Sequence, residues 1–323
     1  MPAGGVFGAA DDGAAGTGTG AAEGASCGML AVMRHARRHD TDDPAWLSSS
    51  RYPFDTPISR SARSLAQVKA VADRLNLLGV PLHAILSSPF HRCLQTAVAL
   101  SQLLDPGVRP PRLLVMASLS EAHQPDILFR TQAPNLYQRL TLRWWRLTCG
   151  RRTRRLLSLE PGWNALRMEL LLDLRGWPPM PEAPSEAHAR FNQLLHECSL
   201  RGPGREGALR GCDPAGAPSA PPPSSSYVVV SHGAAVAAAV LWAHPGLFVE
   251  AVHFAGCVVL RHHPPCGGAA ATAAPLAPAG AADGQLVRAG ARGSAAEGEW
   301  RIQPPLLGVE VVDRGQADAS WGC

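Results

Sequence analysis

One short stretch near the amino terminus most constrains the fold: an apolar run that ends in a cluster of cations. The run Met29–Met33 predicts a buried parallel strand, because Gly28 bounds it on one side and charge on the other. Five basic or titratable side chains follow it: Arg34, His35, Arg37, Arg38 and His39. In open α/β sheets ligands bind where strands end. Arginine forks bind phosphate with bidentate hydrogen bonds, and a neutral imidazole can attack phosphorus. The stretch therefore predicts a phosphate site, with a basic surface turn as the alternative when it is read alone.

Three further apolar runs are predicted strands that lead to a polar residue. These runs are His83–Leu86, Leu113–Met116 and Tyr227–Ser231. The polar residues that follow them are, in the same order, Arg92, Glu121 and His232. Taken singly, each has a structural explanation: a solvated charge, a loop acid or a structural histidine. Several strand ends that deliver such groups favour a shared ligand site instead.

The alternation of strands and helices predicts an α/β fold, a three-layer sandwich in which helices flank a mainly parallel central sheet. A helix is expected between Ser59 as N-cap and Gly79 as stop signal, and another over Ser185–Leu200. Cys257–Leu260 is predicted to be an edge strand, and Trp300–Val312 a terminal strand or tail. The sequence thus predicts one sheet with helices on both faces.

Low-complexity segments surround and interrupt a single predicted domain at residues 28–312, which carries a helical insertion, a cap, at 122–180. Segments rich in Gly, Ala, Pro and Ser cannot bury a core, so we expect disorder in them. They are the amino-terminal tail 1–27 and the insertions 202–226 and 264–298, and residues 313–323 form a further tail.

Composition excludes several classes of protein. The net charge of +4 is too mild to predict a nucleic-acid partner, and no apolar run reaches the ~18–20 residues of a membrane helix. The eight cysteines form no CxxC pair or compact His/Cys cluster, which favours free thiols in a reducing compartment. We expect a cytoplasmic protein without membrane partners, cofactor or metal. The arginines at 151, 152, 154 and 155 leave a nuclear location, an anion patch or a solvated helix face open.

The order of five motifs adds a resemblance to a known family. The motifs are RHxxR at 34–38, FDTPIS at 54–59, SSPFHRCLQTA at 87–97, LSE at 119–121 and a strand ending in SHG at 231–233. Together they resemble the histidine phosphatase superfamily, which shares the phosphoglycerate-mutase-like fold, and within it the TULA/Sts-type phosphatase domain. The resemblance implies a metal-independent phosphomonoesterase that acts through phosphohistidine on phosphotyrosine proteins or small phosphorylated molecules. A phosphoglycerate-mutase-like phosphotransferase and a non-catalytic phosphate-binding or scaffold protein are the alternatives.

The resemblance also implies roles for six residues. His35 resembles the nucleophile, His232 the second pocket histidine, Glu121 the proton donor, and Arg34, Arg38 and Arg92 the phosphate-binding arginines. Asp40 and Asp126 compete with Glu121 as the acid. Ala36 stands where the motif has Gly, so a positive φ there would cost ~1 kcal/mol. The oligomeric state stays open, a homodimer included.

Overall fold

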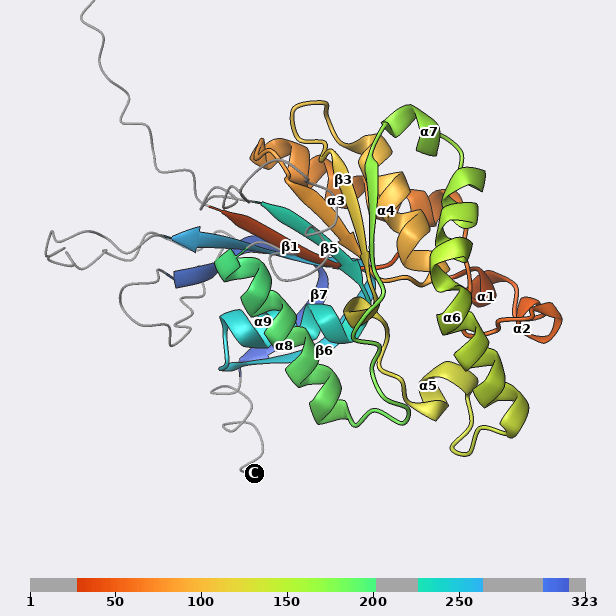
Figure 1. The fold of residues 1–323 in the computed structure, drawn as a ribbon. Coiled ribbons are helices and arrows are strands. Elements are labelled where there is room, and N and C mark those ends of the chain that lie inside the picture. Colours follow the sequence, from red (N-terminus) through yellow and green to blue (C-terminus); the bar gives the residue numbers. More distant parts are fainter. Residues whose placement is uncertain (1–27, 202–225, 264–298, 314–323) are drawn as a thin grey trace, which may run out of the picture.

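In the computed structural model, the described residues are 28–201, 226–263 and 299–313. Within them seven strands form one sheet in the order β4-β3-β2-β5-β1-β6-β7 (Figure 1). The strands are β1 Met29–Arg34, β2 Ala84–Ser87, β3 Arg112–Met116, β4 Glu169–Asp173, β5 Tyr227–Ser231, β6 Leu247–His263 and β7 Glu299–Asp313. The first five in this list run parallel, and β6 and β7 are antiparallel. The sheet is therefore mainly parallel, as predicted.

Helices cover both faces of this sheet, which makes the predicted three layers (Figure 1). They are α1 His39–Asp42, α2 Trp46–Ser49, α3 Ala62–Leu78, α4 His91–Leu103, the 3₁₀ turn η1 Ala117–Leu119, α5 Pro125–Phe129, α6 Leu136–Leu159, α7 Trp163–Leu166, α8 Pro184–Arg201 and α9 Gly233–Ala243. Helices α3, α4 and α6 pack in one core, and α8 and α9 pack in the other.

The central strand β1 explains why its sequence is apolar without alternation. Ala31 and Met33 face the core of α3 and α4, whereas Leu30 and Val32 face the core of α8 and α9. A strand that is buried on both faces needs apolar residues at every position. β1 lies between β5 and β6, so its carboxyl end is flanked by a strand on each side and does not lie at a lateral edge of the sheet.

The structure corrects three details of the predicted fold. The insertion 122–180 is not only helical, because β4 lies inside it and pairs in parallel with β3. Cys257–Leu260 is not an edge strand, since it belongs to β6, which pairs with both β1 and β7. Helix α3 is capped by Ser61, whose Oγ accepts from the Ser64 amide, while Ser59 donates to Asp42 instead.

Most of the segments predicted to be disordered, at 1–27, 202–226 and 264–298, lie outside the described residues, and so does the predicted tail at 313–323 apart from Asp313, which ends β7. Ser226 is an exception, because it is buried and its Oγ accepts from the Met29 amide at 3.0 Å. No helix in the described part of the chain is long and apolar enough to cross a membrane.

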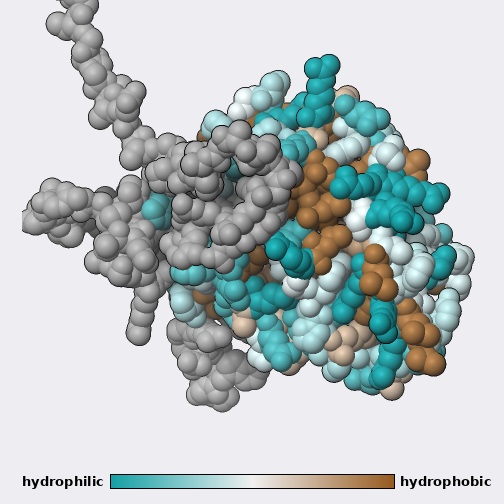
Figure 2. All heavy atoms as spheres, viewed as in Figure 1, coloured by the Kyte–Doolittle hydropathy of each residue, from teal (hydrophilic) through white to brown (hydrophobic). Residues whose placement is uncertain are grey.

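The solvent-exposed side of helix α6 bears both arginines and large apolar side chains. Figure 2 shows apolar patches among hydrophilic atoms on this side of the molecule. The exposed apolar residues of α6 include Leu136, Tyr137, Leu140, Trp144 and Leu147. In the predicted arginine run, residues 151, 154 and 155 are exposed, but Arg152 turns inward to pair with buried Asp55. The interpretation as a solvated helix face therefore holds for three of the four arginines.

Candidate active site

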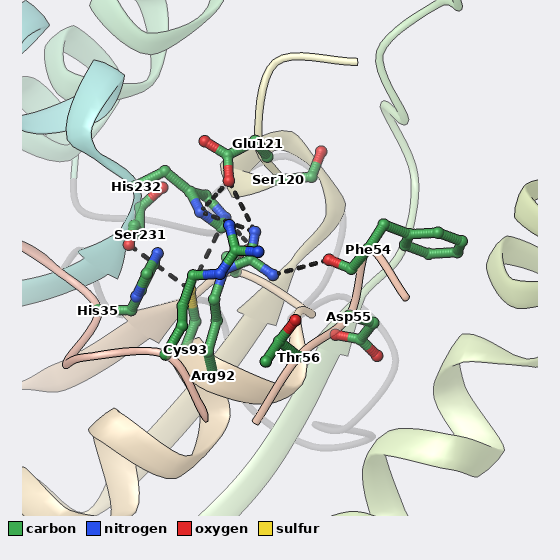
Figure 3. A network of polar contacts seen from close by, with 12 residues as sticks. His35, Phe54, Asp55, Thr56, Arg92, Cys93, Ser120, Glu121, Ser231 and His232 are labelled. Carbon is green, nitrogen blue, oxygen red and sulfur yellow. Dashed lines mark hydrogen bonds and ion pairs between the residues drawn. The ribbon is translucent and has the colours of Figure 1, made fainter. Parts of the chain in front are cut away.

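The order of the strands brings four of the predicted site residues together at the carboxyl ends of the parallel strands. The strands β1, β5, β2 and β3 lie side by side and parallel, so their carboxyl ends meet. His35 follows β1 and His232 follows β5, while Arg92 stands on the first turn of α4 after β2. Glu121 lies just past η1, beyond the end of β3. Figure 3 shows these four side chains gathered around one point.

His35 is buried and held so that one ring nitrogen stays available. Its Nδ1 lies 2.8 Å from the Ala36 carbonyl oxygen, which places the proton on Nδ1 because a carbonyl only accepts. Its Nε2 makes no hydrogen bond with any described residue. Burial, with Arg92 and His232 close by, holds the pKa of His35 well below its usual range. The imidazole is therefore neutral near pH 7, with a free lone pair on Nε2.

Ala36 fits its position without the strain that a positive φ would impose. Its φ is not positive, unlike the φ of Arg130, Arg167 and Ala255. The side chain of Ala36 is completely buried in the core, and its amide donates to Thr96 Oγ1 at 3.0 Å. The change from the motif Gly carries no left-handed penalty here.

Arg92 connects three parts of the site. Its Nη2 donates to Glu121 Oε2 at 2.6 Å, and its Nη1 donates to the Phe54 carbonyl oxygen at 2.9 Å. The guanidinium also lies over the Phe90 ring, 4.4 Å from the centroid. Three separate contacts therefore fix the orientation of a side chain that is itself buried.

Arg34 is a half-buried cation that forms no ion pair within the described part of the chain. Its Nη1 donates to the Val252 carbonyl oxygen, and its guanidinium lies 4.5 Å from the centroid of the Phe254 ring. No carboxylate of the described residues lies within ion-pair distance of it, and its Nε has no hydrogen-bond partner. Burial lowers its pKa, and the more distant carboxylate of Glu121 opposes that shift only in part. Arg34 is thus prepared for an anionic ligand.

Glu121 and His232 form a directly bonded pair. His232 Nδ1 lies 2.9 Å from Glu121 Oε2, and its Nε2 lies 3.0 Å from Ser88 Oγ. Burial, partly opposed by Glu121, lowers the pKa of His232 to about 4, so the neutral ring donates through Nδ1 and accepts from Ser88. Burial alone would raise the pKa of Glu121, but His232 and Arg92 hold that pKa well below its usual range. Glu121 is therefore ionised in the free site.

The other predicted residues lie apart from this cluster. Arg38 donates from Nε to Asp40 at 2.8 Å, and Arg130 donates to the same carboxylate at 3.1 Å. Arg38 nevertheless lines one cavity together with Arg92. Asp40 is held by two arginines, and Asp126 is exposed on α5. Of the three candidate acids, only Glu121 contacts the cluster.

Three side chains near the site are absent from the set that the sequence predicts: Ser88, His123 and Cys93. Ser88 stands inside the SSPFHR motif, so its hydroxyl was a visible signal. His123 lies two residues beyond Glu121, and its pKa is well below the usual range because it is buried beside Arg146. Cys93 also reaches the site, but burial raises the pKa of its thiol to about 12, which keeps it protonated.

A buried carboxylate anchors the cap to the site. Asp55, from the FDTPIS motif, accepts from the His91 amide at 2.7 Å and from Trp145 Nε1 at 3.0 Å. It also pairs with Arg152. Because His91 begins α4 while Trp145 and Arg152 belong to α6, one carboxylate joins the helix that bears Arg92 to the helical cap.

The cluster offers donor atoms for a metal, but its charge favours an anion. His35, Glu121 and His232 place ligand atoms within 4.8 Å of one another, a set of a kind that zinc accepts. The Nη2 atom of Arg92 lies 2.6 Å from Glu121 Oε2 and 3.4 Å from His232 Nδ1, so a cation there would meet a guanidinium. The arrangement suits a ligand that carries negative charge.

Comparisons with known proteins return likenesses in structure only. No family model matches the chain, and no curated protein matches its sequence. The chain is similar to the ecdysone phosphate phosphatase of Bombix mori in complex with tungstate, with a TM-score of 0.42, 13% identity, and 79% of this chain and 98% of that chain covered. A mycobacterial glucosyl-3-phosphoglycerate phosphatase complexed with VO3 matches with a TM-score of 0.41, 18% identity, and 86% and 99% covered. TM-scores below 0.5 carry no argument about function, which rests on the site itself.

Proposed function

We propose that the protein is a phosphomonoesterase of the histidine phosphatase superfamily that works through phosphohistidine. One observation carries the proposal: the free Nε2 of neutral His35 belongs to a cluster with two arginines, buried Arg92 and half-buried Arg34, of which Arg34 has no carboxylate within ion-pair distance among the described residues. A phosphate group supplies the missing anion and presents phosphorus to the nucleophile at the same time.

The chemistry follows from the positions of the groups. Attack by His35 Nε2 forms the P–N bond and breaks the ester P–O bond, while Nδ1 keeps its proton and donates a hydrogen bond to the Ala36 carbonyl, which stabilises the resulting cation. Arg34 and Arg92 neutralise the phosphoryl oxygens, where charge resides in the transition state. The Nδ1–H of His232, which is bonded to Glu121 in the free site, becomes a further donor to these oxygens when Glu121 takes up a proton. Water then forms a new P–O bond, breaks the P–N bond and restores His35.

Glu121 changes its protonation state during this cycle. It is ionised in the free site, where it accepts from Arg92. A phosphate dianion competes for that guanidinium and adds negative charge nearby, which raises the pKa of the carboxyl. The protonated acid then gives its proton to the leaving oxygen and later takes one from the attacking water. Substrate binding thus causes Glu121 to take up the proton that it later donates as the general acid.

The motifs support a finer placement with the TULA/Sts-type phosphatase domain. FDTPIS supplies Phe54 and Asp55, which contact Arg92 and the α4 terminus, and SSPFHRCLQTA supplies Ser88 and Arg92 themselves. The two motifs thus meet in one network of contacts.

Trapping of the phosphoenzyme tests the proposal. The full chain, mixed with ³²P-labelled phenyl phosphate and quenched rapidly, should carry an acid-labile, base-stable label and should release phosphate. His35→Ala should abolish both, and His39→Ala, at a partly exposed position nearby, should abolish neither. Labelling that survives in His35→Ala would refute the role of His35. Absence of turnover by the unaltered protein on any phosphomonoester would refute the function and favour a phosphate-binding protein.

A further inference from the structure

A cavity of about 330 Å³ opens beside the phosphate-binding arginines. Arg38 and Arg92 lie in its wall, so it adjoins the cluster around His35. Apolar side chains from two sides form most of the remaining lining: Leu47, Pro53 and Phe54 on one side, and Ile127, Leu128 and Phe129 on the other. The second group belongs to α5, which precedes the cap helix α6 (Figure 1).

We propose that this cavity holds the alcohol portion of the substrate and selects phosphomonoesters of apolar alcohols or phenols over those of sugars. The inference rests on the proposed function and deepens it. When a phosphate is bound at Arg92, the alcohol portion beyond its ester oxygen needs a space next to that arginine. The apolar cavity provides such a space, because Arg92 is one of its lining residues.

The wall of the cavity and the phosphate site are physically joined. The carbonyl oxygen of Phe54 accepts from Arg92 Nη1 at 2.9 Å, and Phe54 is also one of the residues that line the cavity. The rings of Phe54 and Phe129 meet edge to face, with their centroids 5.5 Å apart. An apolar body placed against these rings would therefore have its phosphate within reach of Arg92.

The polar groups of the cavity are poorly suited to sugar hydroxyls. Ser48 donates its hydroxyl proton to the Ala45 carbonyl at 2.8 Å, and Gln138 Oε1 accepts from the Asn135 amide at 2.9 Å. Arg38 and Arg130 donate to Asp40. Among the side chains that line this space, only Ser48 Oγ and Gln138 Oε1 have lone pairs left to accept from a sugar hydroxyl, so a body with several hydroxyls would lose water without enough acceptors.

The test compares two esters of primary alcohols, benzyl phosphate and glucose 6-phosphate, so that leaving-group chemistry is similar. We expect kcat/KM to be at least about tenfold higher for benzyl phosphate, the worth of one unpaired hydroxyl. Phe129→Ala should lower kcat/KM for benzyl phosphate about tenfold, mainly by raising KM. The kcat/KM for methyl phosphate should stay nearly unchanged, because a methyl group is too small to contact the cavity wall. Ile127→Ser, at an exposed position that folding tolerates, should act in the same direction.

Leu77→Ala is the matched control, because Leu77 is exposed on α3 and should alter neither substrate. Equal or higher kcat/KM for glucose 6-phosphate would overturn the inference and leave the phosphatase standing. Equal losses on benzyl and methyl phosphate in both cavity variants would show that the residues support Arg92 rather than bind the alcohol, and would also overturn it. No turnover of any ester would instead refute the proposed function.

Discussion

The backbone amide of Ala255 donates a hydrogen bond to the carbonyl oxygen of His35 at 3.0 Å. The contact joins antiparallel β6 to the residue that follows β1. Ala255 adopts a left-handed φ of 55° within a bulge, where the register between β6 and β7 shifts from Val252 to Cys257. The bulge also brings Phe254 beside His35, with their ring centroids 5.8 Å apart. An irregularity in an antiparallel strand thus helps to shape a site built mainly on parallel strands.

Gly256→Ala should destabilise the protein by about 1–3 kcal/mol, as overpacking does in tight interiors. A Cβ at Gly256 would lie 2.6 Å from the Gly308 carbonyl oxygen, and backbone atoms cannot rotate away. Urea unfolding measures the change, and Gly107→Ala is the control because nothing lies within 4 Å of its added Cβ. Turnover should fall as well, since the bulge contacts His35. Unchanged stability and turnover in Gly256→Ala would show that the bulge adapts freely.

Glu121→Gln should lower turnover about 10²–10⁴-fold on an alkyl phosphate and much less on nitrophenyl phosphate. A phenolate of low pKa leaves without a proton, whereas an alkoxide needs one. Asp126→Asn, at an exposed position on α5, is the matched control and should change neither rate appreciably. Equal losses on the two substrates would mean that Glu121 orients Arg92 and His232 instead of donating a proton.

Activity should persist after dialysis against excess EDTA. The proposed site neutralises phosphate with Arg34, Arg92 and His232, and a cation among His35, Glu121 and His232 would meet the Arg92 guanidinium. Phosphate release from benzyl phosphate before and after dialysis measures the effect. Loss of turnover that a divalent ion restores would contradict the anion site and identify these residues as metal ligands.

Stability should decline as the pH falls from about 6.5 toward 4. His232 is buried with its pKa lowered to about 4, so in this range the unfolded chain binds a proton that the folded chain does not. That difference amounts to about 3 kcal/mol once the pH has fallen to about 4, of which about 2 kcal/mol is lost by pH 5, and His35 and His123 add loss of the same sign. Urea unfolding at about pH 7.5 and about pH 5 measures it. His232→Gln should reduce the pH dependence, His253→Gln at an exposed position should not, and equal slopes in all three proteins would contradict this account.

The parts of the fold that sequence reasoning predicted are those with a local signature. The runs at β1 and β5 are apolar throughout because both faces are covered, and Gly79 ends α3 with a left-handed φ of 61°. β4 was missed because the short segment Glu169–Asp173 gains its strand geometry from pairing with β3, which no local pattern reports. Long-range pairing of this kind also placed Cys257–Leu260 inside the sheet.

The same distinction holds for the site. Strand ends and motifs predicted that His35, Arg92, Glu121 and His232 would share a region, since sheet order brings parallel ends together. The sequence could not predict that Glu121 is ionised in the free site, because its pKa depends on the placement of His232 and Arg92. Nor could the sequence predict that the guanidinium of Arg38 donates a hydrogen bond to the carboxylate of Asp40.

The buried carboxylate of Asp55 limits how such a protein could diversify. A cap that makes no buried polar contact with the domain beneath it could be replaced during evolution without disturbing the active site. Here, a replacement for α6 that lacked the donors of Trp145 and Arg152 would strand a negative charge in the interior, next to the amide that begins α4. We therefore expect the cap and the residues around Asp55 to evolve together. New substrate specificities should arise by substitutions in the cavity wall and not by replacement of the whole cap.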